Sequence, residues 1–161
     1  MKSKFVTLAL LPISLVSIAS CSNGDSKSAP PLTEDVVRSI GMKNFEGSSK
    51  PDASVLKDAW CERKYTQFMS DNGASSESEL DSLLAVDKGS RPRNGKVTKV
   101  TDVRSIDDQG VALVDSTIEI PQADGKYKTV ARQKDAIRFK REAGQWRLCD
   151  FTEDQVDPSL R

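Results

Sequence analysis

Histidine is absent from the 161 residues of this chain. Without an imidazole, Ser–His and Cys–His nucleophile pairs, histidine general bases and histidine metal ligands are all excluded. The chain also lacks a CxxC pair, HExxH and GxSxG motifs, and a glycine loop of the kind that cradles phosphate. We therefore expect no catalytic residue of these types, no bound metal and no cofactor.

An excess of positive charge is lacking as well, because 24 Lys and Arg residues face 24 Asp and Glu residues. Residues 1–20 hold Lys2 and Lys4 and no acid, so the remainder carries 22 basic against 24 acidic residues. A nucleic-acid-binding protein needs a basic surface to meet phosphates. The charge balance argues against a nucleic-acid partner.

The N-terminus holds the one long apolar run, Phe5–Ile18, which follows Lys2 and Lys4. A helix that spans a bilayer needs about 20 apolar residues, so this run is too short. A positive start and a short apolar core are typical of a secretory signal.

The run ends in Ile18-Ala19-Ser20-Cys21, which resembles the bacterial lipobox: an aliphatic residue, two small residues and a cysteine. The resemblance implies that residues 1–20 are a signal peptide and that Cys21 becomes a lipidated N-terminus. The protein would then lie on the extracytoplasmic face of the cell membrane, anchored by lipid chains. The alternative is an ordinary signal peptide cut nearby, with Cys21 incidental.

The rest of the chain divides into a tether, one domain and a tail. Residues 21–51 start with a Ser-, Gly- and Pro-rich stretch and hold one possible short helix at 33–45, so they read as a flexible tether. Residues 52–152 carry the patterned sequence and are the predicted domain. Residues 153–161 are expected to form a loose acidic tail.

Helical patterns come first within the domain. Asp52 is a plausible N-cap for a helix that runs to about Asp71. Ser76 and Glu79 form a capping box for a short amphipathic helix that carries Leu80, Leu83 and Leu84 at helical spacing.

Strand patterns follow from Lys96 onward. Valines at every third position predict a first strand with a bulge that shifts its parity. Residues 112–120 alternate cleanly. Residues 126–141 read as one long strand that must bend, with cations on the even positions, and residues 145–151 read as the last strand.

The charges predict a register for the central hairpin. Pairing Ile120 with Tyr127 and Ile118 with Thr129 also brings opposite charges together across the ladder. The expected ion pairs are Glu119 with Lys128 and Asp115 with Arg132.

The two other cysteines are Cys61 and Cys149. If Cys21 is lipidated, they form an even pair in an exported domain, where a disulfide is the default. The alternative is two buried free thiols. The parity of Cys149 conflicts with that of Trp146 and Leu148, which leaves either a bulge or a strand covered on both faces.

Helices followed by a meander of about four strands resemble the cystatin-like, nuclear-transport-factor-like superfamily, in which a curved antiparallel sheet and helices form a cone. Trp60-Cys61 and Trp146-Arg147-Leu148-Cys149 resemble small exported lipoproteins of actinobacterial type with such an α+β domain. Enzymes of that superfamily use pocket His and Asp residues, and this chain has no His. We expect a binding or accessory module of the cell envelope, possible partners being envelope proteins. The alternative is a cofactor-independent lyase or isomerase that uses pocket carboxylates.

A pocket is the main candidate site, because Gln133 and Asp135 interrupt the apolar face of the long strand. In this interpretation Asp135 pairs with Asp150, and aromatic residues line the wall; the alternative is that both polar residues simply reach water. The residues proposed for this wall are Tyr65, Tyr127 and Trp146. The basic face of the long strand is either a solvated surface balanced by Glu119 and Asp115, or a surface for anionic lipid headgroups or an acidic partner.

Overall fold

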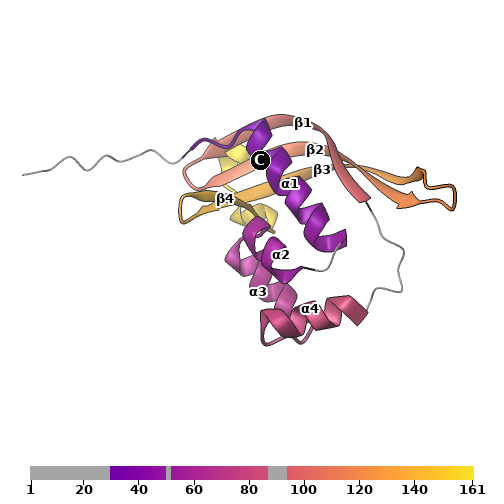
Figure 1. Cartoon of the computed structure of the whole chain (residues 1–161). Coiled ribbons are helices and arrows are strands. Elements are labelled where there is room, and N and C mark those ends of the chain that lie inside the picture. Colours follow the sequence, from indigo (N-terminus) through magenta and orange to yellow (C-terminus); the bar gives the residue numbers. More distant parts are fainter. Residues whose placement is uncertain (1–29, 50–51, 87–93) are drawn as a thin grey trace, which may run out of the picture.

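A computed structural model of the chain describes residues 30–49, 52–86 and 94–161. These residues form four α-helices and then an antiparallel sheet of four strands in the order β1-β2-β3-β4 (Figure 1), which confirms the predicted α+β class. The helices are α1 (Glu34–Ser49), α2 (Ala53–Ala59), α3 (Glu62–Asp71) and α4 (Glu77–Val86), and the strands are β1 (Asn94–Ile106), β2 (Gln109–Pro121), β3 (Tyr127–Glu142) and β4 (Gln145–Leu148). The predicted signal peptide 1–20, the predicted lipidation site Cys21 and residues 22–29 lie outside the described part.

The domain begins earlier than the sequence predicted. Helix α1 occupies part of the expected tether, yet Val37 and Ile40 are buried in the main core. A Cβ atom on Gly41 would lie 2.7 Å from Cγ2 of Val97, so α1 packs very closely on β1. The predicted boundary at residue 52 was therefore wrong, because α1 is an integral layer of the fold.

The single helix expected from Asp52 to Asp71 is broken into α2 and α3. Trp60 and Cys61 are extended between them, and Trp60 forms a parallel bridge with Leu148. The Cys61 N–H donates to the Leu148 carbonyl at 2.9 Å. The chain leaves the helix here because its backbone groups bond to the sheet instead.

The predicted helix caps are present. The Asp52 carboxylate accepts hydrogen bonds from the Ser54 and Val55 N–H groups, which α2 would otherwise leave unpaired. At α4, Ser76 Oγ accepts from the Glu79 N–H at 3.2 Å, while the Glu79 carboxylate reaches Ser75 rather than Ser76. Both helices thus start where the sequence predicted.

The predicted register of the β2–β3 hairpin was wrong. Tyr127 pairs with Pro121 and Thr129 with Glu119, one residue out of step, since the Gln122 N–H donates to the Lys126 carbonyl and shortens the loop. Lys134, not Arg132, stands opposite Asp115.

A bulge at residue 130 changes the faces of β3. Ile118 pairs with Ala131 and Glu119 with Thr129, so Val130 is the extra residue. Consecutive residues of β2 point to opposite faces, so Ala131 and Thr129 do too, although both are odd. The bend expected in this strand exists, but it breaks the single odd-numbered face.

The first strand behaves as predicted. Register shifts fall between Val97 and Lys99 and again between Thr101 and Arg104, which explains the three-residue spacing of its valines. In β2, Ala112, Val114 and Ser116 share the buried face.

The core lies between the sheet and the helices. Phe139 of β3, Leu56 of α2 and Leu80 of α4 are its largest fully buried side chains in the described part. Trp60 and Phe68 make an edge-to-face contact with ring centroids 5.0 Å apart. Among the described residues, no helix has both the length and the apolar character that crossing a membrane would require.

The C-terminal residues are packed rather than loose. Short 3₁₀ turns form at Glu153–Gln155 and Pro158–Leu160. Val156 and Leu160 are buried in a second apolar cluster with Val111. The predicted loose tail was wrong, because these two apolar side chains cover the sheet at β2.

Candidate functional site

A disulfide joins the α2–α3 junction to the end of β4. Cys61 and Cys149 are bonded with their Cα atoms 5.3 Å apart, which confirms the predicted pair. The parity conflict of Cys149 is resolved because β4 ends at Leu148. Beyond that point the Cys149 N–H donates to the Arg138 carbonyl at 2.9 Å, the last backbone–backbone hydrogen bond to β3 among the described residues of this segment.

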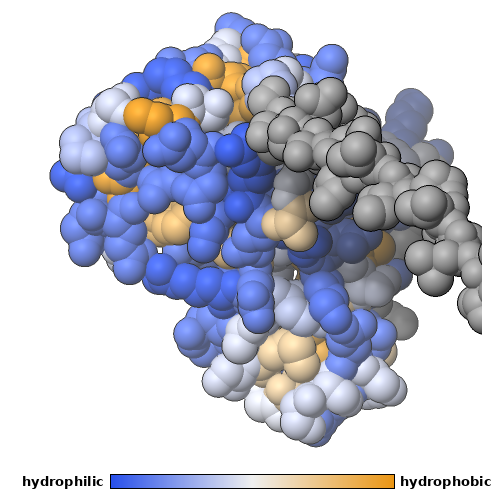
Figure 2. All heavy atoms as spheres, turned by 90° about the vertical axis from the view of Figure 1, so that its left-hand side faces the viewer, coloured by the Kyte–Doolittle hydropathy of each residue, from blue (hydrophilic) through white to orange (hydrophobic). Residues whose placement is uncertain are grey.

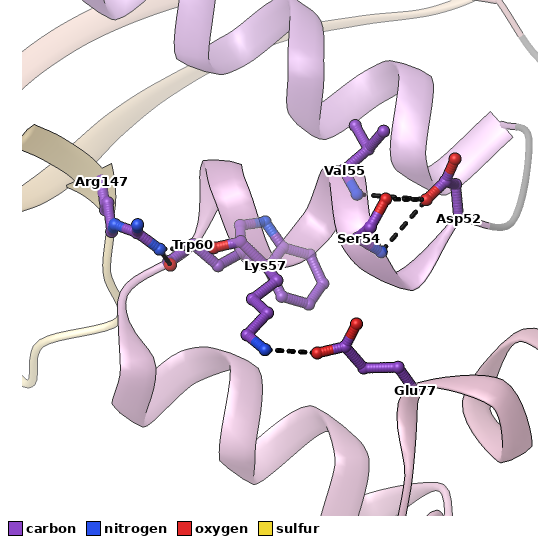
Figure 3. A network of polar contacts seen from close by, with 7 residues as sticks. All are labelled: Asp52, Ser54, Val55, Lys57, Trp60, Glu77 and Arg147. Atoms are coloured by element: carbon purple, nitrogen blue, oxygen red, sulfur yellow. Dashed lines mark hydrogen bonds and ion pairs between the residues drawn. The ribbon is translucent and has the colours of Figure 1, made fainter.

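Arg147 adds a second link between β4 and α2. Its Nη1 donates to the carbonyls of Lys57, at 2.5 Å, and Trp60, at 3.3 Å, at the end of α2 (Figure 3). A cation is favourable there because those carbonyls form the negative end of the helix. Lys57 also pairs with Glu77 of α4, and this bond and charge raise the pKa of Lys57.

A cavity of about 300 Å³ opens beside these links. It lies where the chain after β4 leaves β3, with α1 and α3 on its other sides. Its lining residues are Asn44, Lys64, Asp135, Ala136, Ile137, Arg138, Leu148, Cys149, Asp150 and Phe151. The volume is at the lower end of the range typical of small-ligand sites.

The charged groups of this cavity differ in how firmly they are held. Lys64 pairs with Asp150 and lies 4.8 Å from the centroid of the Trp60 ring, a cation–π contact. Arg138 Nη1 donates to the Phe151 carbonyl at 2.5 Å. Asp135 is exposed and has no hydrogen-bond or ion-pair partner within the described ranges. The wall is thus fixed, and one carboxylate remains available.

Asn44 lines the cavity from α1. Its Oδ1 accepts from Trp60 Nε1 at 2.7 Å, which leaves its amide N–H₂ free to donate. The cavity therefore offers donors from Asn44 and an acceptor from Asp135.

Of the five residues predicted for the pocket, only Asp135 lines this cavity. Gln133 is exposed in a separate groove with Thr98 and Thr117. Asp150 does share the cavity with Asp135, as the pairing hypothesis required, but its ion-pair partner is Lys64.

The three aromatic residues lie elsewhere. Tyr65 lies on α3 and is buried, with 7% of its surface exposed. Burial raises the pKa of its hydroxyl, which has no hydrogen-bond partner among the described residues. Trp146 is buried and its Nε1 donates to the Pro30 carbonyl at 2.9 Å. Tyr127 is 56% exposed and, before the Val130 bulge, faces away from the side of Asp135.

Lys64, Asn44 and Arg138 line the cavity but were not predicted from the sequence as site residues. A signal for Lys64 existed: it follows Cys61 by one helical turn, and Asp150 follows Cys149 directly. A disulfide between the two cysteines brings these opposite charges together. No comparable signal marked Asn44, because α1 was assigned to the tether.

The surface on the left-hand side of Figure 1 is mainly polar. Figure 2, which views the molecule from the left of Figure 1, shows hydrophilic side chains over most of this side, with hydrophobic ones in small separate patches. Within the described part, no group of three or more His, Cys, Asp or Glu side chains could hold a metal ion.

Fold and site together define an α+β protein in which helices pack on one antiparallel four-stranded sheet, with a polar cavity beside β3 at the point where β4 ends. No protein-family model matches the chain, and no curated protein matches it in sequence.

Solved structures resemble it in fold. A protein of unknown function from Mycobacterium tuberculosis has a TM-score of 0.50 at 15% identity, over 78% of this chain and 75% of the other. A nuclear transport factor 2-like protein with a cystatin-like fold from Novosphingobium aromaticivorans has a TM-score of 0.48 at 13% identity, over 75% and 84%. A nuclear transport factor 2-like superfamily protein from Salmonella enterica has a TM-score of 0.46 at 12% identity, over 70% and 82%. Identities this low speak for the fold alone.

Proposed function

We propose that this protein is a lipid-anchored binding module on the extracytoplasmic face of the cell membrane, with the cavity beside Asp135 as its ligand site. The observation that carries the binding role is the contrast within the cavity. Lys64, Asp150 and Arg138 are held in place, whereas Asp135 has no partner in the described residues. A pre-formed wall with a few available polar groups is the usual composition of a binding site.

The location rests on one feature of the sequence and on the disulfide. The tetrapeptide ending at Cys21 resembles a lipobox, and the Cys61–Cys149 bond fits an oxidising compartment outside the cytoplasm. Radiolabelled palmitate should enter the wild-type protein and be lost in Cys21→Ala. Equal labelling of both proteins would contradict the anchor.

The binding role is tested by crosslinking in the membrane. A photo-reactive p-benzoylphenylalanine at position 150 stands at the mouth of the cavity, where the Asp150 side chain is 71% exposed. The same group at position 71, on exposed Asp71 at the far end of α3, is the control. We expect a discrete crosslinked product from position 150 only; identical products from both positions would contradict a site here.

A second candidate is a cofactor-independent lyase or isomerase, favoured by the presence of both Asp135 and Asp150 in one cavity. Asp150 is ion-paired and largely exposed, so it is an electrostatic partner of Lys64 rather than a proton donor. Asp135 is the remaining base. Turnover of the ligand that is lost in Asp135→Asn, while ligand binding is retained, would favour the enzyme over the binding module.

A further inference from the structure

One edge of the sheet is largely open. Strand β4 pairs only with Phe139–Glu142 of β3, although β3 begins at Tyr127. Among the described residues, none pairs with residues 127–137 on the side away from β2. Figure 1 shows this part of β3 running with β2 well beyond the end of β4. Unpaired strand edges present backbone donors and acceptors to any extended chain that approaches.

The last backbone hydrogen bond to β3 shows which residues of this strand direct their N–H and C=O groups to the open edge. The Arg138 carbonyl accepts from the Cys149 N–H, so the Arg138 backbone faces the open side. Successive residues of a strand direct their backbone groups to alternate sides. Ala136, Lys134 and Arg132 therefore present their N–H and C=O groups to the open edge.

The usable edge ends at the Val130 bulge. A bulge disrupts the regular spacing of backbone groups and bends the strand, which limits pairing beyond it. This leaves residues 131–137, and at their C-terminal end the edge meets the cavity lined by Asp135–Arg138 and Cys149. A chain added along β3 would enter this cavity, in line with β4.

The charges on this part of β3 select the partner. Arg132 and Lys134 lie on it, Arg138 lies at its end, and Lys128 lies just beyond the bulge; Asp135 is the single acid from 127 to 138. Opposite charges across a ladder stabilise pairing, and like charges directly opposite destabilise it. An acidic segment would place opposite charges across the ladder and would therefore pair favourably.

A second copy of this chain would place like charges opposite each other. In a two-fold antiparallel pairing, residues directly opposite must share a face, so the centre of symmetry falls on a residue. Centres at 132, 133 and 134 place Arg132 opposite itself, Arg132 opposite Lys134, and Lys134 opposite itself. Each register sets cations against cations, so self-pairing is disfavoured.

We propose that residues 131–137 of β3 bind an extended acidic segment of a partner protein by strand addition, with one end of the segment in the cavity beside Asp135. This inference rests on the binding role proposed above and names the class of ligand. Main-chain bonds supply affinity in such complexes, and side-chain charges supply selectivity.

The test uses three synthetic probes of eight residues: alternating Glu and Thr, alternating Lys and Thr, and the Glu–Thr peptide with a central Thr replaced by Pro. Amide hydrogen exchange of the whole domain, followed by NMR, reports the binding mode. With the Glu–Thr peptide we expect slowed exchange at Arg132, Lys134 and Ala136. Gln133 and Asp135 should not change, because their N–H groups already face β2.

Two variants of equal charge separate strand addition from simple charge attraction. Lys134→Gln keeps the backbone N–H, and Lys134→Pro removes it on the open side only, where proline is tolerated in an edge strand. Fluorescence anisotropy should show the Glu–Thr peptide weakened by about tenfold or more in Lys134→Pro relative to Lys134→Gln. Thermal unfolding of both variants checks that each is folded, and Arg132→Glu with Lys134→Glu should reverse the preference to the Lys–Thr peptide.

Several results would overturn the proposal. No protection of the three amides at millimolar peptide, equal binding of the Glu–Thr and Lys–Thr peptides, or full binding of the proline peptide would each do so. Protection of these amides by self-association without peptide would show that a second copy occupies the edge. A crosslinked product from position 150 together with unprotected edge amides would leave the cavity as a binding site and reject strand addition. Protection of the edge amides without a crosslinked product from position 150 would support strand addition and reject the cavity as a binding site.

Discussion

At β1, helix α1 lies directly against the sheet, whereas much of β3 has no neighbour within the described residues on its outer side. Arg38 of α1 donates to the Val97 carbonyl at 2.8 Å, and a Cβ atom on Gly95 would lie 2.0 Å from Cδ1 of Phe45. On β3, by contrast, Val130 is 50% exposed and its neighbours are mostly exposed as well.

The difference teaches that one sheet can protect its two edges by different means. The β1 edge uses close packing and two register shifts, which restrict the side chains allowed there. The β3 edge uses charge and one bulge, which leave the backbone accessible but select what can approach. Substitutions should therefore be costly on one side and inexpensive on the other.

The largest expected effect comes from the disulfide that holds β4 beside the C-terminal end of β3. Replacing both Cys61 and Cys149 with Ala opens a loop with a sequence separation of 88 residues. The chain-entropy model assigns such a loop about 4 to 5 kcal/mol. Urea unfolding should show a loss of that order as an upper bound, together with faster exchange of the Cys149 position amide, which would extend the open edge.

Reduction of the wild-type protein with dithiothreitol is the control and should reproduce the loss. A decrease below about 1 kcal/mol in both experiments would mean that the links through Arg147 and Lys64 hold β4 without the disulfide.

At the closed edge, Gly95→Ala should lower the free energy of unfolding by about 1 to 3 kcal/mol, because the new methyl group overlaps the Phe45 ring. Denaturant titration measures the change. The double variant with Phe45→Leu should recover part of the loss. A neutral Gly95→Ala would contradict the close packing of α1 on β1.

An acid-sensitive group lies in the helical layer beside the closed edge. Hydrogen bonds from Ser54, and from the Val55 N–H, hold the pKa of Asp52 below its ordinary value of 3.8. The folded state therefore binds this proton more weakly than the unfolded state. The contribution of Asp52 is complete above 3.8 and is lost as pH falls through the folded value.

Urea unfolding between about pH 5 and pH 2 should show this loss. Asp52→Asn keeps an acceptor oxygen but cannot titrate, so its stability should depend less steeply on pH over that range. Identical slopes for the two proteins would remove Asp52 from the acid response.

The smallest effect is expected on the open edge. Arg132 is exposed and stands opposite Thr117, so Arg132→Gln should change the free energy of unfolding by no more than about 0.5 kcal/mol. Measuring the unfolding free energies of Arg132→Gln and Gly95→Ala in the same buffer compares the two edges of the sheet directly. A loss above about 1 kcal/mol would show that this side of β3 is covered in the folded protein.

Local signals in the sequence predicted local structure well. The Asp52 cap follows from the side chain and its position, and the register shifts of β1 follow from three-residue spacing. The disulfide follows from an even count of two cysteines once Cys21 is set aside. Each of these depends on a few residues and on chemistry that acts over a short range or forms a covalent bond.

The rest depends on tertiary contacts that the sequence does not display. Val130 looks like an ordinary strand residue, yet its bulge moves Tyr127 to the other face. The sequence around Gly41 lacks a strong apolar period, and only the close approach to Val97 shows why α1 belongs to the core. The cavity was found through Asp135 alone, because Asn44 and Lys64 reach it from separate helices.

The bond from Trp146 to the Pro30 carbonyl fixes the place where the folded domain begins. Pro30 follows Cys21 by nine residues, which span at most about 30 Å when fully extended. With the proposed lipid on Cys21, the domain would be attached to the membrane at its β4 end. The unpaired part of β3 has its C-terminal end next to β4, and its other end lies farther from the attachment. A partner would have to come within a few nanometres of the bilayer to be bound, so the short connection between Cys21 and Pro30 would limit the distance at which the protein can bind.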